Sequence, residues 1–172
     1  MESLRALLAI DHRRALEFFA SGLRDVCDTE VNEQELLYNA SVLAHYAQVS
    51  TQTPIELPTP SSLVDVFDHF VCGTVLYHDS EMMEIAGTQC LLLSGFFETQ
   101  MRGRHNIRWY SELGAGYFSR AAAGAKSTPK SRLLETMARR FEQWRQRHSR
   151  LGRELRDQSY ILDGGSGPSR SV

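Results

Sequence analysis

The last third of the chain carries the pattern that most restricts what it folds into. Seven residues recur at alternating spacings of three and four, which places their side chains on one face of an α-helix. They are Leu134, Met137, Phe141, Trp144, His148, Leu151 and Leu155. Such a seam is stable only when it packs against another apolar surface. The pattern therefore predicts a long amphipathic helix over residues 130–157, within a helical protein.

The rest of the chain also favours helices. Apolar residues spaced by three and four predict helices over about 3–27, 32–49, 61–71, 80–97 and 107–123. Asn32 and Asn106 precede two of these segments, where an asparagine side chain caps the first turn. The 80–97 segment is apolar nearly all round, which is typical of a buried central helix. Because no convincing strand pattern occurs, we expect an all-α, single-domain bundle of about six helices with a long amphipathic C-terminal helix.

Changes in composition divide the chain into three regions. Its 172 residues suit one domain. We expect an acidic helical core domain over residues 1–128 and a basic, heptad-patterned helix over residues 129–157. The remaining residues, 158–172, are rich in glycine towards their end and are expected to form a flexible tail.

Cysteine usage and the length of the apolar runs point to a compartment. Cys27, Cys72 and Cys90 are odd in number and widely spaced, which argues against a disulfide framework or a cysteine-rich zinc site. Such usage favours a reducing compartment. The apolar runs are far shorter than the roughly 20 residues that cross a bilayer, and the first eleven residues hold too short an apolar segment for a signal peptide. We therefore expect a cytoplasmic protein with no membrane contact.

The net charge of −2 conceals a strong asymmetry along the chain. Residues 1–98 hold four basic side chains against fifteen acidic ones, a net charge of −11. Residues 99–157 hold fourteen basic side chains against five acidic ones, a net charge of +9. This division is compatible with a basic helix solvated on an acidic body, with two halves that attract each other, or with a nucleic-acid partner.

The basic region flanks the seam with arginines. In a parallel homodimer, Arg140, Arg145 and Arg147 would each face a like charge, which is unfavourable. The seam should therefore pack on an acidic surface, either the protein's own N-terminal body or a protein partner. We take Arg140, Trp144, Arg145, Arg147 and His148 as candidate partner-binding residues. A polar residue such as His148 in a seam commonly fixes register, and packing of the helix on its own domain is the simplest interpretation.

A second candidate site is the basic loop before the 107–123 segment. Arg102, Arg104, His105 and Arg108 surround the start of a predicted helix, where free backbone N–H groups favour anions. The loop is therefore a candidate binding site for a phosphate or carboxylate. The alternative is an ordinary basic connector.

Motifs for catalysis or metal binding are missing from the sequence. It has no Glu-x-x-His or His-x-x-x-His pair, no Gly-x-Ser-x-Gly turn and no phosphate-binding glycine loop. His69 with Cys72 is too incomplete a pair for nucleophilic catalysis, because no third group orients it. Asp65, Glu81 and Glu84 are more simply a solvated or capping acidic face. We expect no catalytic residue, no metal and no cofactor.

Several packing motifs are similar to those of a family. They are the run Gln89–Phe97, which ends in Ser-Gly-Phe-Phe, and Trp109-Tyr110 with Leu113-Gly114, Tyr117 and Ala121-Ala122, preceded by Tyr38 and Leu43-Ala44. With these residues, the chain resembles an uncharacterised family of small helical bacterial proteins over roughly residues 12–123. The resemblance implies a shared all-α fold and carries over no catalytic residue.

Together, these patterns predict a non-enzymatic, cytoplasmic helical protein that acts through protein–protein contact, as an adaptor or regulator. The alternative is a nucleic-acid-associated accessory protein that uses the basic 99–157 region on phosphates. A third interpretation is an enzyme or a metal-binding helical bundle. The sequence leaves the oligomeric state open.

Overall fold

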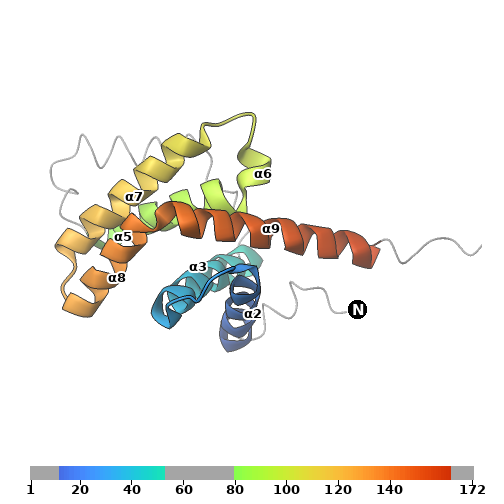
Figure 1. Cartoon of the computed structure of the whole chain (residues 1–172), viewed down its shortest axis with the longest axis horizontal. Helices are drawn as coiled ribbons and strands as arrows, with labels where there is room; N and C mark the ends of the chain where they lie inside the picture. Colours follow the sequence, from blue (N-terminus) through green and yellow to red (C-terminus); the bar gives the residue numbers. More distant parts are fainter. Residues whose placement is uncertain (1–11, 53–79, 164–172) are drawn as a thin grey trace, which may run out of the picture.

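The computed structural model describes residues 12–52 and 80–163, and the described residues form helices with no strand (Figure 1). The helices are α2 (His12–Val26), α3 (Glu33–Gln52), α5 (Ser80–Leu91), the π-helix η2 (Leu92–Phe96), α6 (Glu98–Met101), α7 (Ile107–Gly124), α8 (Thr128–Arg139) and α9 (Phe141–Asp163). The all-α fold is therefore confirmed. The predicted 61–71 helix and the chain's first eleven residues lie outside the described residues.

Helix α9 runs between two groups of helices (Figure 1). The α2–α3 hairpin lies on one side of α9, and α5 and α7 pack together on the other side. Asn32 begins α3 as predicted, since its Oδ1 accepts hydrogen bonds from the backbone N–H groups of Gln34 (2.9 Å) and Glu35 (3.3 Å). Asn106 likewise caps α7 by accepting from the Trp109 N–H at 3.2 Å. Local capping chemistry thus sets where two of the helices begin.

The predicted 130–157 helix is two helices, α8 and α9, separated by a turn at Arg140. Residues 158–163, which we expected in the tail, belong to α9. The seam keeps its face across the turn, because its members on α8 and its first four members on α9 are all buried. They are Leu134, Met137, Phe141, Trp144, His148 and Leu151. Periodicity alone does not reveal the break, since the turn leaves the spacing of buried residues unchanged.

The predicted 80–97 helix also changes form, from α5 into the π-helix η2. The N–H of Phe97 donates to the Leu92 carbonyl at 2.9 Å, which widens the last turn. Gly95 in this turn faces α9 so closely that a Cβ there would lie 2.9 Å from the Cβ of His148. The absence of a side chain therefore lets η2 and α9 pack backbone to backbone.

The core fills the space between these helices and contains most of the large side chains. Its largest fully buried members are Trp144, Tyr117, Phe118 and Phe141. Gly114 on α7 makes room for the Phe141 ring, whereas Gly116 on the same helix has no neighbour within 4 Å of an added Cβ. In the described part of the chain, no helix is both long enough and apolar enough to span a membrane.

Candidate functional site

The basic C-terminal helices pair with the acidic N-terminal half of the same chain. Arg140 Nη1 lies 3.0 Å from Glu35 Oε2, and the Trp144 indole N–H donates to Glu35 Oε1 at 3.2 Å. Two further ion pairs join Arg150 to Asp28 (2.7 Å) and Lys130 to Glu84 (2.8 Å). These contacts compensate part of the asymmetry of charge within one molecule.

The five candidate partner-binding residues mostly face inward. Trp144 and His148 are fully buried, and Arg145 is buried among carboxylates. Arg147 lies over the Trp144 ring at 4.6 Å, and Arg140 is held by Glu35. Trp144, Arg145 and His148 therefore belong to the protein's own interior, with Arg140 and Arg147 at its edge, so the seam itself is not available to a partner in this conformation.

The predicted anion-binding residues do not all line one cavity. Arg102 and Arg108 line a polar cavity of about 570 Å³, whereas Arg104 and His105 do not. Carboxylates occupy the same cavity: Arg102 pairs with Glu98 at 2.6 Å and Arg108 with Glu112 at 3.0 Å. An anion in this cavity would meet negative side chains, and the arrangement therefore does not favour an anion.

Arg145 organises the inner wall of this cavity. Its guanidinium bonds Glu142 (2.7 Å) and Glu98 (3.2 Å) and donates to the Ser94 carbonyl at 3.0 Å. The hydrogen bond from Arg145 is the main reason that the pKa of Glu142 is lowered to about 2. Burial raises the pKa of Glu98, but hydrogen bonds from Ser149 and from the arginines outweigh it and leave this pKa lowered. This cluster holds α6, η2 and α9 together and leaves Arg145 few hydrogen-bond donors for a ligand.

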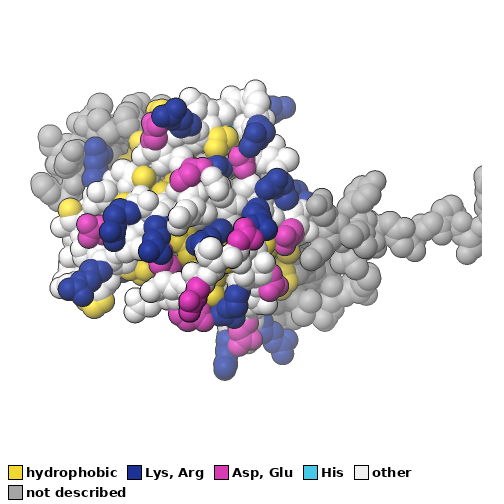
Figure 2. Space-filling view, viewed as in Figure 1, with side chains coloured by type: hydrophobic (Ala, Val, Ile, Leu, Met, Phe, Trp, Pro, Cys, Tyr) yellow, Lys and Arg dark blue, Asp and Glu magenta, His cyan; other side chains and the backbone are white. Residues whose placement is uncertain are grey.

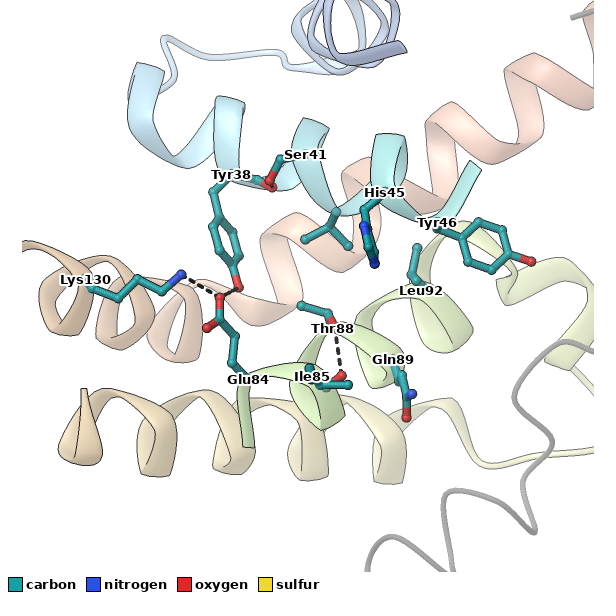
Figure 3. A pocket seen from close by; sticks show the side chains of 11 residues that line it. Tyr38, Ser41, His45, Tyr46, Glu84, Ile85, Thr88, Gln89, Leu92 and Lys130 are labelled. Carbon is teal, nitrogen blue, oxygen red and sulfur yellow. Dashed lines mark hydrogen bonds and ion pairs between the residues drawn. The ribbon is translucent and has the colours of Figure 1, made fainter. Parts of the chain in front are cut away.

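A different surface, a groove between α3 and α5, has the properties of a binding site. It has a volume of about 480 Å³, and Val42, Ile85, Leu92 and the rings of Tyr38 and Tyr46 supply its apolar surface. Polar side chains border it, namely Ser41 and His45 on α3 and Thr88 and Gln89 on α5. Figure 3 shows α3 and α5 as its two walls, with side chains from both directed into the space between them. We call it the α3–α5 groove.

One end of the α3–α5 groove carries a neutral polar cluster (Figure 3). The Tyr38 hydroxyl and Lys130 Nζ both donate to Glu84 Oε1, each at 2.8 Å. Burial, reinforced by the negative charge of Glu84, raises the pKa of Tyr38, which keeps its hydroxyl protonated as a donor. The lysine also lies over the Tyr38 ring, 5.4 Å from its centroid. The cluster therefore adds polarity to the groove without net charge.

Exposed apolar side chains concentrate on the two helices that form the groove. Among the described residues, the large apolar side chains that remain exposed are Leu37 on α3, Met82 and Ile85 on α5, and Trp109 on α7. Ile85 is 49% exposed and Leu37 is 47% exposed. Next to Leu37 in the chain, Leu36 is buried in the core.

This groove was not predicted from the sequence, although one signal in the sequence points to it. The 80–97 segment is apolar nearly all round, and we interpreted this as complete burial. Instead, Met83, Ala86 and Cys90 face the core while Ile85 faces the groove. A helix with more apolar surface than one buried face needs is also typical of a binding surface.

Those candidate catalytic and metal-binding residues that the structure describes give no further site. Glu84 is engaged by Tyr38 and Lys130, and Asp65, His69 and Cys72 lie outside the described residues. Over 12–52 and 80–163, no group of three histidine, cysteine, aspartate or glutamate side chains is placed to hold a metal ion.

Comparison of the chain with protein-family models, curated proteins and solved structures gave no match. The α3–α5 groove is therefore identified by its geometry and chemistry alone.

Proposed function

We propose that this chain is a non-enzymatic protein-binding module of the cytoplasm, and that its α3–α5 groove receives the apolar face of a helix from a partner protein. The single observation that supports this most strongly is the groove itself, an open apolar surface between two helices with polar side chains along its border. Protein grooves of this composition bind amphipathic helices through apolar residues spaced by three and four.

The lining of the groove defines the chemistry of its occupant. Glu84 and Lys130 neutralise each other, and the remaining lining residues carry no formal charge when His45 is neutral. A charged side chain buried there would lose its hydration without gaining a partner. The contacting face of the partner is therefore apolar, and its polar residues lie over Ser41, His45, Thr88 and Gln89.

The distribution of charge supports a protein partner over nucleic acid. Several of the basic side chains that suggested phosphate contacts are paired with carboxylates of the same chain, including Arg102, Arg108, Arg140 and Arg150. Figure 2 shows Lys and Arg interleaved with Asp and Glu over the visible face rather than gathered into one basic strip. Nucleic-acid proteins present clustered positive charge to phosphates.

The cytoplasmic location is proposed from thiol chemistry. Cys27 and Cys90 are both free in the structure, and the wide spacing of the cysteines gives no disulfide framework. Unpaired thiols are typical of proteins in reducing compartments.

Site-specific photocross-linking in cells tests the proposal. A photoreactive amino acid at Thr88 should cross-link a partner, whereas the same group at exposed Gln143 on α9 should not cross-link that partner. The cross-linked partner segment, made as a peptide, should bind the purified protein. Ile85→Asp should weaken its binding at least about tenfold, because a carboxylate in the apolar groove opposes the partner's apolar face.

The matched control is Gln143→Asp, which adds the same charge on an exposed part of α9. The proposal fails if both variants bind the peptide as the unmodified protein does. It also fails if no peptide is captured at Thr88 and an oligonucleotide binds with an affinity that falls steeply with salt.

A further inference from the structure

A buried polar contact joins α3 to α9. Asn39 and His148 are both fully buried, and the Nε2 atom of His148 lies 2.9 Å from Oδ1 of Asn39. The Asn39 amide nitrogen donates to the Glu35 carbonyl at 2.8 Å and lies 3.3 Å from Met137 Sδ. Since the amide nitrogen is the donor in those contacts, Oδ1 is the acceptor, and Nε2 of His148 carries the ring proton.

The other ring nitrogen of His148 has no such partner. Its Nδ1 atom is buried and has no hydrogen bond in the structure. Protonation would therefore place both a new N–H donor and a positive charge in an apolar environment. Burial accordingly lowers the pKa of His148 to about 3, from 6.5 for an exposed histidine.

The surroundings provide no charge that would stabilise the imidazolium. Glu35 on α3 is engaged by Arg140 and Trp144, and Glu98 on α6 is engaged by arginines and by Ser149. On α9 the charged residues nearest to His148 in sequence, Arg145, Arg147 and Arg150, are positive, and the acidic groups Glu142 and Asp28 are engaged by Arg145 and Arg150. The π-helix η2, which packs against His148 through Gly95, has no titratable side chain. Burial is the cause of the shift in pKa.

The Asn39–His148 contact lies between the α2–α3 hairpin and the C-terminal helices, so it bears on whether the two stay together. Polar contacts join the α2–α3 hairpin to the C-terminal helices at Asp28–Arg150, at Glu35 with Arg140 and Trp144, and at Asn39–His148. Both side chains are exposed in the first of these contacts and Arg140 is half-exposed in the second, so water stabilises those groups when they separate. The Asn39–His148 contact is fully buried, and it is the one whose separation exposes a histidine.

We propose that the Asn39–His148 contact is a proton-operated latch: the α2–α3 hairpin separates from α9 as a unit, separation exposes His148, and acidification favours the separated state. The sign follows from proton binding. Between about pH 6.5 and pH 3 the separated state binds a proton that the closed state does not. The ratio of separated to closed molecules should therefore rise up to about tenfold for each unit that the pH falls in this range.

The latch also bears on the groove, a consequence that depends on the function proposed above. Helix α3 forms one wall of the α3–α5 groove, so separation of the hairpin removes that wall. A partner helix should then bind more weakly at pH 5 than at pH 7, and a bound partner should in turn hold the latch closed.

Hydrogen exchange tests the latch without any partner. Protection factors of backbone amides in α2 and α3 should be lower than those in α5 and α7 at every pH, because the hairpin opens by itself. Between pH 6.5 and pH 5 the hairpin factors should fall by up to about tenfold per unit after correction for intrinsic exchange. Equal protection of both regions, or hairpin protection that does not change with pH, would overturn the proposal.

Three variants test whether His148 is the histidine responsible for the pH dependence. His148→Gln should remove the pH dependence of hairpin protection, while His45→Gln, at an exposed histidine of the same hairpin, should leave it unchanged. Asn39→Asp places a carboxylate opposite His148, so its hairpin should be better protected at pH 5 than at pH 7. Unchanged pH dependence in Asn39→Asp would contradict the latch even if His148→Gln does not fold.

Failure of the latch and failure of the groove give different results. A hairpin with pH-independent protection and a peptide that still requires Ile85 would refute the latch alone. Normal pH-dependent protection without any peptide binding at the groove would refute the groove alone.

Discussion

Glu35 and Trp144, 109 positions apart in the chain, are joined by a hydrogen bond of 3.2 Å from the indole N–H to the carboxylate. Both residues are buried, and the same carboxylate also pairs with Arg140 at the turn between α8 and α9. A carboxylate in the first turn of α3 is further favoured by the helix dipole. One acidic residue of the N-terminal half thus positions both the largest buried side chain of the seam and the break in the C-terminal helix.

Removal of this carboxylate should destabilise the protein. Glu35→Ala leaves the Trp144 indole N–H buried without an acceptor, which should lower the free energy of unfolding by about 2–3 kcal/mol. Glu35→Gln keeps an acceptor and should cost less. Urea denaturation at pH 7 measures both. The control is Glu33→Ala, which removes an exposed ion pair with Arg24 and should cost less than about 1 kcal/mol; equal costs for Glu33→Ala and Glu35→Ala would contradict the argument.

Arg145 should be essential for stability. The Glu98 carboxylate is nearly buried, and Arg145→Met removes this charge partner as well as the donor to the Ser94 carbonyl. The free energy of unfolding should therefore fall by about 3–5 kcal/mol. Arg108→Met removes an exposed ion pair within one helix and should have an effect below about 0.5 kcal/mol. Thermal unfolding of the two variants compares them directly, and a small effect for Arg145→Met would show that the cluster is not a structural centre.

Two glycines of α7 should respond to alanine in opposite directions. A Cβ on Gly114 would clash with Phe141 Cζ and lie 2.8 Å from Cys90 Cβ, so Gly114→Ala should destabilise the protein by about 1–3 kcal/mol. Gly116 is exposed and has nothing within 4 Å, so Gly116→Ala should stabilise it by about 0.5–1 kcal/mol through better helix propensity. Urea midpoints that shift in the same direction for both variants would contradict this packing.

The two described cysteines should differ in reactivity. Burial raises the pKa of the Cys90 thiol to about 12, and this side chain is fully enclosed. Cys27 is half-buried; burial raises its pKa as well, but nearby Arg147 and Arg150 oppose the change. N-ethylmaleimide at pH 7.5 should therefore label Cys27 at least about tenfold faster than Cys90. Mass spectrometry of the labelled peptides measures both rates; in urea they should become similar, and similar rates without urea would be evidence against the burial of Cys90.

Much of the helical framework could be predicted from local sequence. Asn32 and Asn106 mark the starts of α3 and α7, because a capping side chain satisfies N–H groups only two or three residues away. Residues 134 to 151 of the seam are buried as the heptad spacing requires. These features depend on neighbours within two turns, and short-range spacing records them directly.

The candidate site could not be predicted in the same way. Leu36 and Leu37 are both apolar, and only the packing of the complete bundle decides that Leu36 is buried and Leu37 exposed. Likewise, Arg145 reads as a surface charge in the sequence, yet Glu98 and the Ser94 carbonyl enclose it in the structure. The desolvation cost of burying the Arg145 charge is therefore offset by partners that lie about fifty positions away in the chain.

By itself, the sequence determined that this chain is helical, where several helices begin, which face of the C-terminal segment is apolar, and that its two halves carry opposite charge. The tertiary structure decided which residues contact one another and which surfaces remain exposed. It broke the predicted helix at Arg140, placed the seam on the protein's own acidic half through Glu35 and Asn39, and left the α3–α5 groove open. The physical reason is range: periodicity and capping act within a few residues, whereas burial and charge pairing depend on side chains that only the complete fold brings together.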